Sequence, residues 1–141
     1  MLMGEYSHSL DAKGRVIIPS KLREQLGERF VVSKGLDGCL FAFPVAEWEK
    51  FESKLQALPL TNKDARKFSR YFLAGASEVE LDKQGRALLP ASLRDAAELE
   101  KDLVLCGVGN RIEIWDKARW LAFSAYDDVD ELAEKMADLG I

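Results

Sequence analysis

Histidine and cysteine are scarce in this sequence, which contains one histidine and two cysteines among 141 residues. A Ser/His/Asp triad would have to use His8 as its base, but His8 lies in the alternating stretch from Glu5 to Leu10, which is typical of a surface strand. Cys39 and Cys106 lie far apart without metal-ligand spacing, so we expect two buried, reduced thiols rather than a zinc site or a disulfide. The sequence therefore predicts neither an enzyme nor a cofactor.

Long apolar runs are also absent. The longest, from Leu40 to Ala46, contains Pro44 and falls far short of the ~18 residues that a membrane helix needs. The N-terminal segment does not combine a basic stretch with an apolar one, so it does not resemble a signal peptide. We expect a cytoplasmic protein with no membrane partner.

An excess of positive charge, which most nucleic-acid-binding domains have, is missing as well. The formal net charge is −4 at pH 7. The negative charge is concentrated in residues 127–141, which hold six acidic residues and one basic residue, and the rest of the chain is about neutral. Because an acidic tail lowers the average over the whole chain, a local basic surface stays compatible with this composition.

The feature that the sequence does contain is an internal repeat. Residues Leu10–Glu24 return as Leu81–Asp95, with seven of fifteen positions identical. Each copy opens with an Asp-x-x-Gly-Arg turn, in which glycine permits a positive φ and aspartate can bond the backbone. The matching residues are Asp11, Gly14 and Arg15 in the first copy and Asp82, Gly85 and Arg86 in the second.

Both copies continue with the same predicted elements. After the turn come an apolar strand, a proline and a short helix, then two strands joined by a glycine-containing hairpin, and a closing helix with a tryptophan. The predicted strands are Arg15–Ile18, Phe30–Ser33 and Cys39–Phe43 in the first copy and Arg86–Leu89, Leu103–Cys106 and Arg111–Trp115 in the second. The predicted helices are Ser20–Leu26, 45–58, Ala91–Ala97 and Lys117–Ala125, and a helix that ends near Ala74 connects the two copies.

These elements divide the chain into two repeated units. We assign residues 5–58 to the first unit, 59–75 to a connecting helix, 76–125 to the second unit and 126–141 to an acidic C-terminal helix. A unit of roughly 50 residues is too small to bury a good core alone, so we expect the two units to pair. The predicted fold is mainly β with short helices (α+β), built as an intramolecular pseudo-dimer that completes one barrel.

The paired turns are the strongest candidates for a binding site, because a two-fold unit presents them as a matched pair to a repeating polymer such as DNA. Arginine can bond phosphate oxygens or the O6/N7 edge of guanine, and lysine supplies a point charge. The cations of the turns are Lys13, Arg15, Lys83 and Arg86. The residues alone leave a second interpretation equally open, in which the aspartate and arginine of each turn pair with each other and lock it. Arg23 and Arg94, in the following helices, are expected to be structural or rim contacts.

Two further segments have open interpretations. The connecting helix carries four cations, Lys63, Arg66, Lys67 and Arg70. They form either a solvated face or a phosphate-facing surface. The C-terminal helix has a short apolar stripe, formed by Val129, Leu132, Met136 and Leu139. This stripe can dock on its own chain or on a neighbouring subunit, and the sequence does not choose between them.

The doubled motif, Leu-Asp-x-x-Gly-Arg followed by three apolar residues and Pro-x-x-Leu-Arg, resembles the MraZ family of bacterial regulators, which have two SpoVT-AbrB-type domains. The resemblance covers nearly the whole chain. It implies an AbrB-like swapped-hairpin barrel, a ring-like homo-oligomer, and binding to double-stranded DNA repeats upstream of the protein's own division and cell wall operon, usually as a repressor. The family's Asp-x-x-x-Arg motif falls on Asp11/Arg15 and Asp82/Arg86.

The predicted function is a cofactor-free, oligomeric, nucleoid-associated transcriptional regulator. Arg15 and Arg86 are the leading DNA contacts, with Lys13 and Lys83 as phosphate partners, although Lys83 lies one position earlier in its turn than Lys13. The alternative is an antitoxin-like interaction module with an AbrB-type barrel, which would bind a protein partner instead of DNA.

Overall fold

The computed structural model describes all residues from Met1 to Ile141. The first half of the chain forms β1 (Leu2–Ser9), β2 (Arg15–Ile17), α1 (Ser20–Leu26), β3 (Arg29–Lys34), β4 (Leu40–Pro44), α2 (Val45–Gln56) and α3 (Lys63–Ala74). The second half forms β5 (Ser77–Glu80), β6 (Arg86–Leu88), α4 (Ala91–Ala96), β7 (Asp102–Gly109), β8 (Ile112–Asp116), α5 (Lys117–Phe123), α6 (Val129–Met136) and the 3-10 helix η1 (Ala137–Leu139). The two halves thus repeat the same order of strands and helices.

The strands of the two halves pair with each other rather than only among themselves. Six strands form an antiparallel sheet in the order β1-β7-β8-β4-β3-β5, and β2 pairs with β6 in a two-stranded ribbon. The first strand of each half lies beside the third strand of the other half, as β1 with β7 and β5 with β3. Exchanging equivalent strands of the two halves leaves this order unchanged, so the topology has a two-fold symmetry between β4 and β8. The fold is α+β with a mostly antiparallel sheet, and closure into a swapped-hairpin barrel stays a prediction.

The central strands are apolar on both faces because helices cover both. On β3, Phe30 and Val32 belong to a cluster of 18 buried residues that also contains residues of α1, α4 and the β2–β6 ribbon. Val31, between them, points to the opposite face and joins a second cluster, which is built around α2 and α3. Alternation with a period of two along the strand therefore supplies two cores. Trp48 of α2 lies in the second core.

The strands β1 and β7 are longer than the sequence pattern predicts. β1 begins at Leu2 rather than Glu5, and β7 continues to Gly109 rather than ending at Cys106. The cause is tertiary, because β1 pairs with β7 along its full length. Gly107 consequently lies in a strand and not in the predicted turn, and a Cβ at this position would lie 2.3 Å from the backbone nitrogen of Met3. This glycine permits the close approach of β1.

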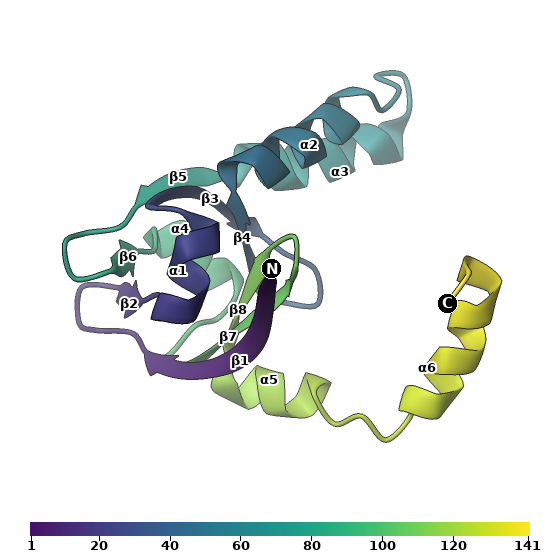
Figure 1. Cartoon of the computed structure of the whole chain (residues 1–141). Helices are drawn as coiled ribbons and strands as arrows, with labels where there is room; N and C mark the ends of the chain where they lie inside the picture. Colours follow the sequence, from purple (N-terminus) through teal and green to yellow (C-terminus); the bar gives the residue numbers. More distant parts are fainter.

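The helices α5 and α6 differ in their relation to the body of the protein. α5 follows β8 directly, whereas α6 stands apart from the sheet and the other helices (Figure 1). No helix in the structure has both the length and the apolar composition required to cross a membrane. No three side chains of histidine, cysteine, aspartate or glutamate come together in a way that could hold a metal ion.

Because the larger cluster contains residues of both units, shortening the side chain of Phe30 is expected to lower the stability of the fold strongly. This side chain is fully buried in the larger cluster, and Phe30→Ala is expected to lower the free energy of unfolding by about 3–5 kcal/mol. Urea unfolding followed by circular dichroism measures the change. The exposed side chain of Met3 provides the control, since Met3→Ala should change stability by less than about 0.5 kcal/mol. Equal effects of the two substitutions would contradict the described core.

Candidate nucleic-acid interface

The two Asp-x-x-Gly-Arg turns lie side by side at one end of the molecule, beyond the β2–β6 ribbon (Figure 1). Reciprocal backbone bonds tie each turn to the strand of the other unit. The N–H of Ile18 donates to the carbonyl of Gly85 at 3.0 Å, and the N–H of Leu89 donates to the carbonyl of Gly14 at 3.0 Å. The spacing of the turns is therefore set by the pairing of the two units.

The first turn is organised by the carboxylate of Asp11. Its Oδ1 accepts the backbone N–H groups of Lys13 and Arg15, each at 2.9 Å, and its Oδ2 accepts Nε of Arg15 at 2.6 Å. Gly14 has a φ of 82°, a conformation that glycine adopts without the steric cost of a side chain. One carboxylate thus fixes both the loop backbone and the arginine side chain.

The second turn repeats this arrangement. Oδ1 of Asp82 accepts the backbone N–H groups of Gln84 and Arg86, each at 2.9 Å, and Oδ2 accepts Nε of Arg86 at 2.7 Å. Gly85 has a φ of 76°. The sequence repeat is thus also a repeat of hydrogen-bond geometry.

The aspartate–arginine pair of each turn is formed, as one of the two interpretations of the sequence predicted. This pair uses only part of the guanidinium group, however. Arg15 and Arg86 each donate only Nε to the carboxylate, and neither Nη atom of either residue has a hydrogen-bond partner in the chain. The pair leaves the Nη donors of each guanidinium group without a partner in the chain, and a planar fork of this kind matches phosphate oxygens or the edge of guanine.

Arg23 and Arg94, which were expected to be structural or rim contacts, lie against the turns of the opposite unit. A Cβ on Gly14 would lie 2.7 Å from Cζ of Arg94, and a Cβ on Gly85 would lie 2.8 Å from Cζ of Arg23. Each turn glycine therefore permits both a positive φ and the close approach of an arginine. The guanidinium groups also bring one further cation beside each turn.

Lys13 and Lys83 do not occupy equivalent positions. The backbone of Lys13 donates to its aspartate, and the residue that makes this bond in the second turn is Gln84. Lys83 instead lines a hollow with Arg23, Glu24 and Glu28 at the edge of the second turn. The structure thus brings all four predicted cations to the same end of the molecule. The two arginines are related by the two-fold symmetry, whereas the two lysines are not.

The ribbon also carries two exposed apolar side chains, Ile17 and Leu88, which were not predicted as site residues. Val16 and Ala87 point into the core, so their neighbours face outward. The outward residues are Arg15, Ile17, Arg86 and Leu88. Ile17 is 44% exposed and Leu88 is 56% exposed. Their alternation was visible in the sequence, but their place opposite the arginines, with Ile17 across from Arg86 and Leu88 across from Arg15, depends on the pairing of β2 with β6, which no local pattern indicates.

The turn hydrogen bonds also change the titration of the two aspartates. The backbone N–H of Arg15 is the main cause that lowers the pKa of Asp11, and partial burial opposes it. The backbone N–H of Arg86 does the same for the pKa of Asp82. Both carboxylates are thus held in the charged form that orients the arginines.

The two cysteines lie outside this site. Both are buried and unpaired, as predicted, and burial raises the pKa of the Cys106 thiol to about 11. Burial also raises the pKa of the Cys39 thiol. Neither residue has the low pKa and exposure of a reactive thiol.

Comparison with known proteins identifies the origin of the doubled turn. The family model described as "MraZ protein, putative antitoxin-like" matches the chain twice, over residues 1–71 and 72–139. The chain belongs to the MraZ family. A protein of Thermoanaerobacter sp. (strain X514) is 58% identical over 143 residues, with both chains covered completely. A protein of Acetivibrio thermocellus is 57% identical with the same coverage.

The similar proteins bear a functional name. Both are called "Transcriptional regulator MraZ", as is a protein of Carboxydothermus hydrogenoformans that is 57% identical over 98% of each chain. These names agree with the MraZ resemblance and do not favour the interaction-module alternative. The two MraZ matches meet at residues 71 and 72, within α3, so the two repeated turns fall in separate MraZ matches.

The lowered pKa values predict how acid affects the turns. Asp11 and Asp82 add stability above their ordinary pKa of 3.8 and lose it as the pH falls through their lower folded values. The double variant Asp11→Asn/Asp82→Asn is therefore expected to be less stable than the wild type at pH 7. The difference should shrink as the pH falls below 3.8, where the wild-type carboxylates also become neutral.

Urea unfolding at pH 7 and pH 3 measures this difference. Asp127→Asn/Asp128→Asn is the matched control, because these two carboxylates accept no hydrogen bond and α6 has no side-chain cap. The control should lose less stability at pH 7. A stability difference for the turn variant that stays the same at both pH values would contradict the assignment.

Proposed function

We propose that this MraZ-family transcriptional regulator binds double-stranded DNA with the end formed by the β2–β6 ribbon and its two turns. Arg15 and Arg86 are the principal contacts, and Lys13 and Lys83 add phosphate contacts. The observation that carries the proposal is the pair of guanidinium groups, each anchored at Nε with both Nη atoms directed to no partner in the chain. An anchored arginine loses less conformational entropy on binding than a free one.

The outward face of the ribbon supports a groove contact. The major groove of B-DNA admits a two-stranded β-ribbon, and its base edges include the N7/O6 acceptors of guanine and the methyl group of thymine. Arg15 and Arg86 supply donors for the first, and the exposed Ile17 and Leu88 supply apolar contacts for the second. The cross-strand order of these residues is two-fold symmetric, so the ribbon suits a site with inverted symmetry.

The proposed assembly explains how an acidic chain holds DNA. A single copy presents few cations at the ribbon end, and its net charge of −4 opposes approach to a polyanion. In a ring-like homo-oligomer, several ribbon ends engage repeated sites at once, and the effective concentration of each further contact raises the overall affinity. We propose repeats upstream of the chain's own division and cell wall operon as the sites, with repression through occupancy of the promoter.

The remaining predictions fit this function. We propose that the two units, residues 5–58 and 76–125, form a swapped-hairpin barrel that the connecting helix (59–75) links and the acidic C-terminal helix (126–141) extends. The exchange of β1 and β5 between the halves supports this architecture. A cytoplasmic, nucleoid-associated location follows from the proposed DNA target.

The proposal predicts a specific loss of DNA affinity in Arg15→Ala. Loss of one arginine fork should weaken binding to the DNA upstream of the gene by about 1–3 kcal/mol, which is about 5- to 150-fold. Arg86→Ala should have a similar effect. Fluorescence anisotropy with the native duplex and a scrambled duplex, over a salt series, measures the change.

Two comparisons separate binding from folding. Lys50→Ala removes a positive charge from α2, which lies away from the ribbon end (Figure 1), and should leave the affinity unchanged. Arg15→Lys keeps the charge without the fork and should recover less than the full affinity. Unfolding of Arg15→Ala at the assay temperature would instead assign the arginine a purely structural role. Equal binding of the wild type to both duplexes would reject sequence-specific recognition.

A further inference from the structure

The two halves differ in the helix that follows each closing helix, which is α3 after α2 in the first half and α6 after α5 in the second. In the first half α3 returns along α2 and places Phe72 in the second core, where the side chain is fully buried. In the second half the corresponding helix, α6, follows α5 but does not pack on it (Figure 1). The stripe of α6 therefore stays in solvent, with Leu132 39% and Leu139 74% exposed. An amphipathic helix of this kind is stable only when its apolar side is covered.

A complementary surface lies between α2 and α3. This α2–α3 hollow is lined mainly by Leu55, Leu58, Leu60, Leu73, Arg66 and Arg70. Leu60 is 81% exposed, so apolar surface is available at the rim as well as at the floor. The hollow thus offers leucine side chains for an apolar stripe and arginine side chains for the flanks of a helix.

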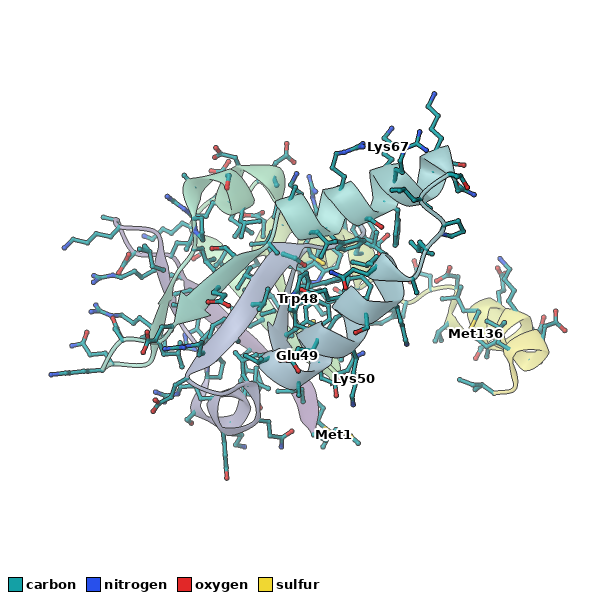
Figure 2. All side chains as sticks on the ribbon, turned by 90° about the horizontal axis from the view of Figure 1, so that it is seen from above. Met1, Trp48, Glu49, Lys50, Lys67 and Met136 are labelled. Carbon is teal, nitrogen blue, oxygen red and sulfur yellow. The ribbon has the colours of Figure 1, made fainter.

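The charges of the two surfaces are opposite. α3 carries Lys63, Arg66, Lys67 and Arg70, all exposed and none paired with a carboxylate. Lys67 extends away from the body of the protein (Figure 2). α6 carries Asp130, Glu131 and Glu134 with one lysine, and all three acids are exposed. Opposite potentials of this kind steer association and fix its register.

We propose that the acidic helix α6 of one copy docks in the α2–α3 hollow of a second copy of this chain. Figure 1 shows α5 below the sheet and the α2–α3 pair above it, and the short segment 124–128 joins α6 to α5, which favours a second copy over the same chain as the occupant. Every copy then carries one helix and one hollow, so the contact is heterologous and continues from copy to copy until a ring closes. The inference deepens the proposed function, because it rests on the self-assembly that concentrates the DNA-binding ends.

A heterologous contact has a signature that a symmetric contact lacks. Leu132→Asp damages the helix and leaves the hollow intact, whereas Leu60→Asp damages the hollow and leaves the helix intact. Each variant alone is expected to have the mass of one chain in size-exclusion chromatography with light scattering, where the wild type forms an oligomer. An equimolar mixture of the two should form a dimer and nothing larger, because only one intact helix and one intact hollow remain per pair.

Matched variants test the chemistry of the contact. Leu121→Asp introduces the same charge at an apolar residue of α5 that is 62% exposed, and it should keep the wild-type mass. Arg66→Glu/Arg70→Glu should lower the mass, and combination with Asp130→Arg/Glu134→Arg in the same chain should restore it. Circular dichroism confirms that each variant is folded before its mass is compared.

Several results would overturn the inference. They are a monomeric wild type, a wild-type mass for Leu132→Asp, and a mixture of the two leucine variants that stays monomeric. Docking within one chain would appear as a monomeric wild type whose α6 amides lose hydrogen-exchange protection in Leu132→Asp. DNA measurements separate this inference from the proposed function. Leu132→Asp should bind a duplex with one repeat as the wild type does and should bind a duplex with several repeats more weakly. Arg15→Ala should lose affinity for both duplexes and keep the wild-type mass.

Discussion

The pairing of β2 with β6 is the constraint on which the site depends. This short ribbon joins the two halves of the chain, and the bonds of Ile18 to Gly85 and of Leu89 to Gly14 extend it into the turns. Because each turn is bonded to a strand of the other half, each turn keeps its position only when both halves are folded together. A lone unit would lose both its core and the spacing of its arginines, so folding and presentation of the site are one event.

Within each turn a single carboxylate performs two tasks that usually need separate residues. Asp11 satisfies two backbone donors, which shapes the loop, and it holds Nε of Arg15, which orients the side chain. A partly exposed ion pair of this kind adds little to stability, so its value lies in restricting the rotamers of the arginine. The arrangement makes a structural pair compatible with the proposed DNA-binding role of the arginine, although the two look like competing interpretations in the sequence.

The sequence predicts the elements far better than their partners. Local signals were sufficient for helix α1, whose bounds Ser20–Leu26 follow from Pro19 and Gly27, and for the two turns, whose chemistry is contained in five adjacent residues. Pairing is set by distant residues, and for this reason the full extent of β1 and the strand position of Gly107 could not be read from local patterns. The outward position of Ile17 and Leu88 is hidden for the same reason, since it depends on which strand β2 meets.

The uneven distribution of charge along the chain can be explained by comparing the helices α3 and α6 of its two halves. A duplicated chain could have kept two equivalent helices after the hairpins, but here one became basic and packed as α3, and the other became acidic and stayed free as α6. Negative charge near DNA normally weakens binding, and a tail that carried it in solution would work against the ribbon end. If the acids of α6 are neutralised by the cations of α3 in the next copy, assembly removes both charges from the surface. In the proposed ring, the field that reaches DNA is dominated by the arginines of the turns, and their affinity depends on the assembly that the other charges build.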